Sequence, residues 1–205
     1  MAHLADARAL PFDADLPLID GDLVVAGTLR IDAQDQLRRE LSSGEPHSLS
    51  AASDARLVAL AYRRWSHHLA EHLIGDYAFV VWDRRERRLV CARDPHGNRP
   101  LFWARCGSVL VLGSSAEVAR SLPGVSSALH EPALVDLLGE GYVRDAERTV
   151  FRDVRRLPAA HTLVFEGVAA TALHRHWDFP VPSPIRYRRD DDYLAHFNDV
   201  LGEAL

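Results

Sequence analysis

Three short segments in which nearly every position is apolar stand out along the chain. They are Tyr77–Asp83, Arg88–Arg93 and Leu101–Arg105, separated by the short turns Arg84–Arg87 and Asp94–Arg99. A strand with one face in water alternates apolar and polar residues, and these segments do not. We therefore predict three adjacent strands whose sheet is covered on both faces, by a second sheet on one side and by helices on the other.

The rest of the chain predicts a mixture of helices and strands without an internal repeat. Asp32 is expected to cap a helix that ends at Leu41, and Ser53 is expected to cap a longer helix that runs to Trp65. The further predicted elements are strands over Asp22–Leu29, Val109–Gly113 and His161–Phe165, helices over His67–Leu73, Ala116–Leu122 and Glu131–Leu138, a loop over Ser43–Ser50, loop and edge structure over Tyr142–Val154, and a linker over Pro180–Pro184.

The end of the sequence has a different pattern. After Asp190–Asp192, the apolar residues Leu194, Phe197, Leu201 and Leu205 recur at helical spacing and share one face. No segment of the printed sequence is expected to cover this face. We therefore expect residues 1–180 to form one domain, and residues 181–205 to be a linker and the first helix of a further domain that the sequence does not include.

Composition narrows the classes of function. The 205 residues are 47% hydrophobic and 26% charged, as in a globular protein. The net charge of -5 gives no reason to expect a nucleic-acid partner, and no apolar run approaches the roughly 20 residues that span a bilayer. The two cysteines, Cys91 and Cys106, lack metal-ligand spacing, which favours a reduced, cytoplasmic protein.

Cysteines and histidines that could serve as catalytic or metal-binding groups have a simpler interpretation. Cys91 lies within a predicted strand and is expected to be buried, whereas Cys106 is expected in an exposed turn. His68 and His72 have the i,i+4 spacing of some zinc ligands, but no third ligand is evident, so no metal site is predicted.

Other polar residues are expected to have structural or solvent-exposed positions. His174 and His176 are predicted at the surface, and His96 is predicted to be part of a turn. Arg93 and Asp94 are expected to form an ion pair that fixes the same turn.

The apolar strands also carry a sequence pattern that extends to other parts of the chain. Its segments are Gly75-Asp-Tyr-Ala-Phe-Val-Val-Trp-Asp83, Ala92-Arg-Asp-Pro-His-Gly-Asn-Arg-Pro-Leu101, Ser53-Asp54, Ser115-Ala-Glu117, Gly141–Pro158 and His176-Trp-Asp178. Together they resemble the glutamine amidotransferase-like domain of asparagine synthetases and their relatives, which include lasso peptide cyclases. The resemblance implies an α+β fold, the four-layer αββα sandwich of N-terminal-nucleophile hydrolases, here without its first strands. Its structural motif residues are Gly75, Asp76, Arg93, Asp94, Gly97 and Pro100.

The resemblance also implies that the glutaminase site is degenerate and that the chain has no catalytic residue. Active members use an N-terminal cysteine as nucleophile, whereas position 2 here is Ala2. The asparagine-glycine pair that stabilises the oxyanion aligns with Ala26 and Gly27, so the side-chain donor is lost. The remaining residues of the glutamine site are Gly27 and Asp54, which would bind the α-amino group of glutamine.

These features lead to one expected function and two alternatives. The first is the glutaminase-like domain of an ATP-dependent amide ligase, an asparagine synthetase or a lasso peptide cyclase relative, that is catalytically silent alone. The alternatives are a non-catalytic module that binds a separately encoded synthetase, and a fragment of an active glutamine-hydrolysing enzyme. No cofactor is expected in this chain, since ATP and Mg would bind to the missing synthetase domain. The expected partners are that domain, in cis or in trans, and glutamine or a peptide substrate, but neither nucleic acid nor a membrane.

Overall fold

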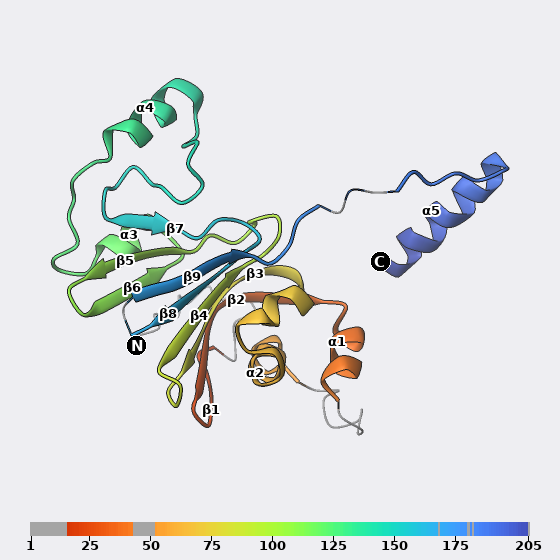
Figure 1. Ribbon diagram of the computed structural model, residues 1–205, viewed down its shortest axis with the longest axis horizontal. Helices are drawn as coiled ribbons and strands as arrows, with labels where there is room; N and C mark the ends of the chain where they lie inside the picture. Colours follow the sequence, from red (N-terminus) through yellow and green to blue (C-terminus); the bar gives the residue numbers. More distant parts are fainter. Residues whose placement is uncertain (1–15, 43–51, 168, 180, 182, 205) are drawn as a thin grey trace.

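Two antiparallel sheets form the centre of the structure (Figure 1). The computed structural model describes residues 16–42, 52–167, 169–179, 181 and 183–204. One sheet has the strand order β1-β2-β3-β4-β8-β9, and the other has the order β6-β5-β7. In chain order the strands are β1 (Leu18–Asp20), β2 (Leu23–Asp32), β3 (Ile74–Asp83), β4 (Arg88–Arg93), β5 (Phe102–Cys106), β6 (Val109–Gly113), β7 (Val154–Arg156), β8 (His161–Glu166) and β9 (Ala169–Arg175).

Helices cover the outer faces of both sheets. The helices that do so are α2 (Asp54–Trp65), the 3-10 helix η3 (Ser66–His72) and α3 (Ala116–Arg120). Helix α1 (Gln34–Leu41) packs on α2, whereas α4 (Glu131–Glu140) and α5 (Asp190–Ala204) lie away from the two sheets (Figure 1). α2 contacts β1 and β2 and η3 contacts β8, whereas α3 contacts all three strands of the smaller sheet. The layer order is therefore helix, sheet, sheet, helix, which confirms the predicted αββα sandwich (Figure 1).

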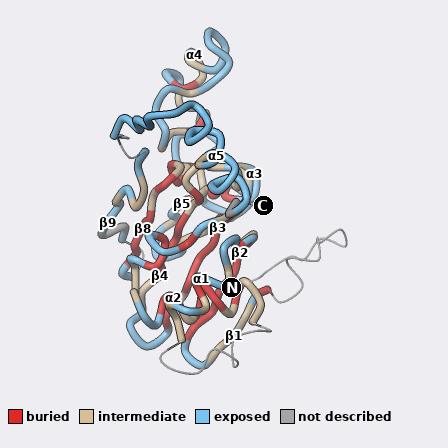
Figure 2. The backbone as a smooth tube through the Cα atoms, turned by 90° about the vertical axis from the view of Figure 1, so that its right-hand side faces the viewer, coloured by how far each residue is buried: buried red, intermediate tan, exposed pale blue. Residues whose placement is uncertain are grey.

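The central strand β3 is buried on both of its faces. Tyr77, Phe79 and Val81 belong to the core that packs against α2 and η3. Ala78 and Val80 point the other way, into the core between the two sheets. Figure 2 shows the buried residues concentrated along the central strands. The prediction of strands with two covered faces is confirmed.

The prediction that all three apolar segments are neighbours is wrong for the third. β3 pairs with β4, but the other neighbour of β4 is β8, and β5 belongs to the smaller sheet. The turn after Asp94 carries the chain from one sheet to the other. A strand covered on both faces has the same apolar composition in either sheet, so hydrophobicity alone does not distinguish the two pairings.

Three strands and one helix cap differ from the sequence patterns. β1 and β7 have three residues each, too few for a periodic signal, and β9 is an edge strand in which Leu173 is the one large apolar residue. Asp32 does not cap α1, because the N-cap is Ala33, with a left-handed φ of 49°. Asp32 instead pairs with Arg30, whose Nη2 lies 3.1 Å from its Oδ2.

Two other predicted helices lie where expected, but they differ in capping or in helix type. Ser53 occupies the N-cap of α2, although its side chain makes no capping hydrogen bond. The segment predicted as the helix His67–Leu73 is the 3-10 helix η3. The predicted loop over Ser43–Ser50 lies outside the described residues. Within the predicted linker Pro180–Pro184, the described residues belong to no helix or strand.

Replacing Phe79 with alanine should lower the free energy of unfolding by about 3–5 kcal/mol, because the fully buried ring leaves a cavity. The matched control is Ile74→Ala in the same strand, since Ile74 is 57% exposed. That change should alter the free energy of unfolding by less than about 0.5 kcal/mol. Urea denaturation followed by fluorescence measures both values. Equal effects of the two substitutions would contradict the burial pattern of β3.

Candidate functional site

Two glycines allow β2 and β3 to approach closely along their full length. A Cβ atom on Gly27, where φ is 146°, would lie 2.2 Å from the carbonyl oxygen of Ala78. A Cβ atom on Gly75, where φ is 144°, would lie 2.0 Å from the carbonyl oxygen of Arg30. Any side chain at either position would therefore push the strands apart. Gly27 and Gly75 are structural requirements of the site that β2 and β3 build.

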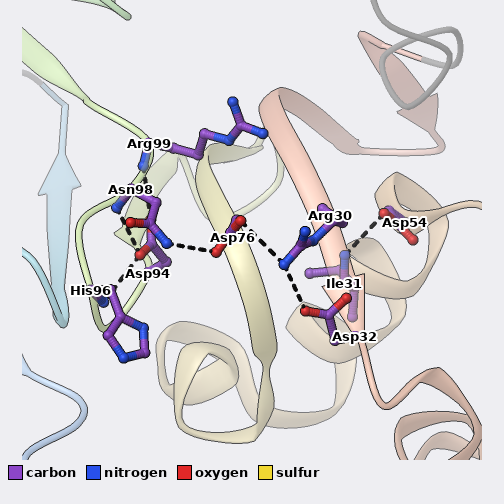
Figure 3. A network of polar contacts seen from close by, with 9 residues as sticks. All are labelled: Arg30, Ile31, Asp32, Asp54, Asp76, Asp94, His96, Asn98 and Arg99. Carbon is purple, nitrogen blue, oxygen red and sulfur yellow. Dashed lines mark hydrogen bonds and ion pairs between the residues drawn. The ribbon is translucent and has the colours of Figure 1, made fainter. Parts of the chain in front are cut away.

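A fully buried carboxylate holds the turn that follows β4. The Asp94 side chain accepts hydrogen bonds from the backbone N–H groups of His96, Asn98 and Arg99, at 3.1, 3.0 and 3.0 Å. These three bonds determine the path of the chain as it leaves the six-stranded sheet (Figure 3). His96 is thus a turn residue, as predicted.

The predicted ion pair between Arg93 and Asp94 is wrong. The Arg93 guanidinium donates to the backbone carbonyls of Arg99, Leu157 and Gly97, at distances of 2.7, 2.8 and 2.5 Å. Neighbouring residues at a strand end point to opposite faces, so the two side chains reach different partners. Arg93 and Asp94 stabilise the same turn from two sides, Arg93 through carbonyl groups and Asp94 through N–H groups. Pro100 is exposed at the end of this turn, just before β5.

A cluster of polar side chains lies where β2, β3 and this turn meet (Figure 3). Asn98 donates from Nδ2 to Oδ1 of Asp76 at 2.8 Å, and Oδ2 of Asp76 lies 3.2 Å from Nη2 of Arg30. Arg30 also pairs with Asp32 at 3.1 Å. The cluster offers a cation, two carboxylates and an amide, the groups that bind the charged ends of an amino acid.

Sequence reasoning identified Asp76 but missed the other members of this cluster. Arg30 and Asp32 are two positions apart on β2, so they share a face, and Arg30 is the register partner of Asp76 on β3. The spacing of Arg30 and Asp32 in the sequence therefore indicated that their side chains lie on one face of the strand. The sequence did not indicate the contact with Asn98, because it depends on how the turn after Asp94 folds back toward β3.

Asp54 lies at the first residue of α2, on the other side of β2 from Asp76 (Figure 3). Its Oδ2 accepts a hydrogen bond from the backbone N–H of Ile31 at 3.0 Å, and its Oδ1 accepts one from Nε2 of Gln34 at 2.7 Å. Burial raises the pKa of this carboxyl group. Asp54 therefore ties α2 to the end of β2 and the start of α1, and the structure does not bring it into the polar cluster.

Ala26 is part of the core between the two sheets and is opposite Val80 in the strand register. The methyl side chain of Ala26 cannot donate a hydrogen bond, so at this position it contributes only apolar contacts to the core. Cys91 is also buried in this core, as predicted, and burial raises the pKa of its thiol well above its usual range. Cys106 is half-buried rather than exposed, because its sulfur lies against Gly124.

One histidine occupies a different position from the one predicted. His176 is half-buried, not at the surface, and its ring nitrogens lie 3.1 Å from Oγ1 of Thr162 and 3.4 Å from the hydroxyl of Tyr77. Burial lowers the pKa of His176 to about 4, so its ring is neutral at pH 7. His72 stacks on the Trp65 ring, with 3.9 Å between the centroids.

A shallow pocket of about 310 Å³ lies elsewhere on the molecule. Its lining includes Trp103, Glu147, Arg155, Leu157 and Leu173. None of the residues of the polar cluster lines it, so the cluster and this pocket are separate features.

Replacing Asp94 with alanine should lower the free energy of unfolding by at least about 3 kcal/mol, because three backbone N–H groups lose a fully buried carboxylate as acceptor and each hydrogen bond to a charged group contributes about 1.5–3 kcal/mol. The exposed residue Asp153 provides the control, since Asp153→Ala should leave the free energy of unfolding nearly unchanged. Chemical denaturation of the two variants gives both values. A cost below about 1 kcal/mol for Asp94→Ala would mean that the turn keeps its shape without the carboxylate.

Comparison with known proteins relates the fold and these residues to one group of sequences. Asparagine synthetase [glutamine-hydrolyzing] 3 of Bacillus subtilis is 27% identical over 171 residues, which are 83% of this chain and 27% of that protein. Asparagine synthetase [glutamine-hydrolyzing] 2 of Oryza sativa is 33% identical over 113 residues, which are 53% of this chain and 19% of that protein. The chain therefore spans about a quarter or less of the length of these relatives.

A solved structure also matches. It is the glutamine phosphoribosylpyrophosphate amidotransferase of B. subtilis, which is 17% identical, with a TM-score of 0.49 over 76% of this chain and 29% of that chain. Within the part of the chain that the structure describes, no helix combines the length and the apolar character needed to cross a bilayer. The glutamine amidotransferase domain family matches residues 12–177, the region that contains both sheets and the polar cluster. The chain belongs to the glutamine amidotransferase domain family, in a form similar to the N-terminal regions of asparagine synthetases.

Proposed function

We propose that this chain is the glutaminase-like domain of an asparagine synthetase-type, ATP-dependent amide ligase, and that it does not hydrolyse glutamine. The observation that carries the proposal is the environment of Asp54. Both of its carboxylate oxygens accept hydrogen bonds from the chain itself, one from Ile31 and one from Gln34. An amine ligand would have to displace or share these bonds, so the residue aligned with the glutamine-amine ligand has a structural role here.

The position aligned with the oxyanion asparagine supports the same proposal. Ala26 contributes a buried methyl group to the core between the sheets. Losing one oxyanion donor costs about 3 kcal/mol of transition-state stabilisation, or roughly a hundredfold in rate. The buried thiol of Cys91 offers no replacement nucleophile, because burial raises its pKa and disfavours the thiolate.

A ligase that joins an activated carboxylate to an amine already present on its substrate does not need ammonia from glutamine. This is the chemistry expected of a lasso peptide cyclase, and it would remove any requirement for a working glutaminase site. In this proposal the ATP and Mg sites belong to a synthetase domain, joined in cis or bound in trans. The amidotransferase-like domain then supports that domain and its substrate.

Glutamine hydrolysis provides the direct test. We expect no glutamate release above the buffer background when glutamine is added to the purified chain, or to the longer polypeptide if its gene encodes one. Calorimetric titration with glutamine should likewise give no saturable heat. Steady glutamate release would contradict the proposal, and saturable binding would contradict the structural role assigned to Asp54. The B. subtilis relative, whose name describes a glutamine-hydrolysing enzyme, is the positive control.

One observation favours the second function, an interaction module for a separately encoded synthetase. Helix α5 lies apart from the sandwich (Figure 1), and Leu194, Phe197 and Leu201 on its apolar face are 63%, 62% and 42% exposed. Apolar side chains that recur on one face of a helix gain free energy when a partner removes them from water. The helix is therefore a candidate contact for a synthetase.

Replacing Phe197 with aspartate should abolish the association of this chain with a synthetase partner, because the charge would be buried in an apolar contact. The control Asp199→Ala changes an exposed residue away from the apolar face and should leave the association intact. Affinity purification of tagged variants from the native cell, with the bound ATP-binding protein identified by mass, measures the difference. If both variants retain the partner equally, α5 is not the contact.

A further inference from the structure

A group of metal-ligand side chains forms where η3 meets the edge strand β9. His68 and Glu71 come from η3, and His174 comes from β9, more than a hundred residues later. One ligand atom of each residue lies within 4.8 Å of the ligand atoms of the other two. Nitrogen and oxygen ligands of this kind can converge on a single ion after small rotations of exposed side chains.

The helix type explains why these residues, and not the pair seen in the sequence, come together. In a 3-10 helix, residues three apart lie directly above one another, whereas residues four apart do not. His68 and Glu71 are three apart, and Nδ1 of His68 lies 2.7 Å from Oε1 of Glu71. His72, four residues after His68, stacks on Trp65 instead. The i,i+4 spacing that places two residues on one face of an α-helix therefore does not bring His68 and His72 together here.

His174 supplies the third side chain, and one of its ring nitrogens is unsatisfied. Its Nε2 lies 3.9 Å from Oε1 of Glu71. This nitrogen is buried and has no hydrogen-bond partner among the described residues. A buried polar atom without a partner is costly, and a bound ion is one of the explanations for such an atom. A metal ion between His174 and Glu71 would satisfy it.

A further histidine packs beside this group. His67 packs against the rings of both His68 and His174, with centroid distances of 4.2 and 6.2 Å.

We propose that His68, Glu71 and His174 bind one Zn²⁺ ion. Two imidazoles and one carboxylate are a common ligand set for zinc, and they leave a fourth position for water or another ligand. The site is independent of glutamine chemistry. Its ion would link the helical layer to the edge of the six-stranded sheet, because η3 and β9 belong to these two parts.

The test is a calorimetric titration of the purified, chelator-treated chain with zinc chloride. We expect one tight site per chain, and a Kd that rises by about tenfold or more in both Glu71→Gln and His174→Gln. The matched control is His72→Gln, a histidine of the same 3-10 helix outside the site, which should leave the Kd unchanged. The three proposed ligands are 53%, 41% and 30% exposed, so their substitution should not prevent folding, and circular dichroism checks this.

A second measurement separates a specific site from loose binding to surface histidines. Zinc should raise the melting temperature of the wild-type chain and of His72→Gln, because a ligand that binds only the folded state stabilises it. The same zinc concentration should leave the melting temperature of His174→Gln unchanged. Equal Kd values in wild type and His174→Gln, or no saturable binding at all, would overturn the proposal.

Discussion

The rest of the structure depends on the burial of β3 on both of its faces. Its alternate residues enter two different cores, one beneath α2 and η3 and one between the sheets. A strand of this kind cannot be stable at the surface of a single sheet, since apolar side chains on either face would be exposed to water. The helix-sheet-sheet-helix order is the arrangement that covers both faces. Helices α2 and η3 cover the first core, and the smaller sheet covers the second.

Close backbone contact and one buried carboxylate then place the polar residues. Gly27 and Gly75 allow β2 and β3 to pair tightly, so that Arg30 and Asp76 face each other across the strands. Asp94 binds three backbone N–H groups and turns the chain toward the second sheet, which brings Asn98 to Asp76. The polar cluster is therefore a consequence of how the apolar layers are joined, and its residues come from three separate segments.

The chain has the fold of the amidotransferase family, but membership of the family does not determine the role of each residue. The fold and the family match concern the same region, residues 12–177. Within it, Asp54 accepts a hydrogen bond from the backbone of Ile31, and Ala26 packs in the core between the sheets. A scaffold can keep its layers while its side chains take structural roles, because the layers depend on apolar burial and the chemistry depends on a few polar groups. The group of His68, Glu71 and His174 illustrates the converse, since it places new chemistry on the same scaffold.

The sequence by itself determined the features that depend on local patterns. The apolar runs predicted β3 and β4 and their two covered faces, and the motif around Gly75 and Asp94 indicated the family. Only the tertiary structure decided that β5 joins the second sheet, that Asp54 binds Ile31 and Gln34, and that His174 meets Glu71. Periodicity reports which face of an element is apolar, but it carries no information about which distant segment packs there. Partners far apart in the chain are selected by packing, and packing exists only in the folded molecule.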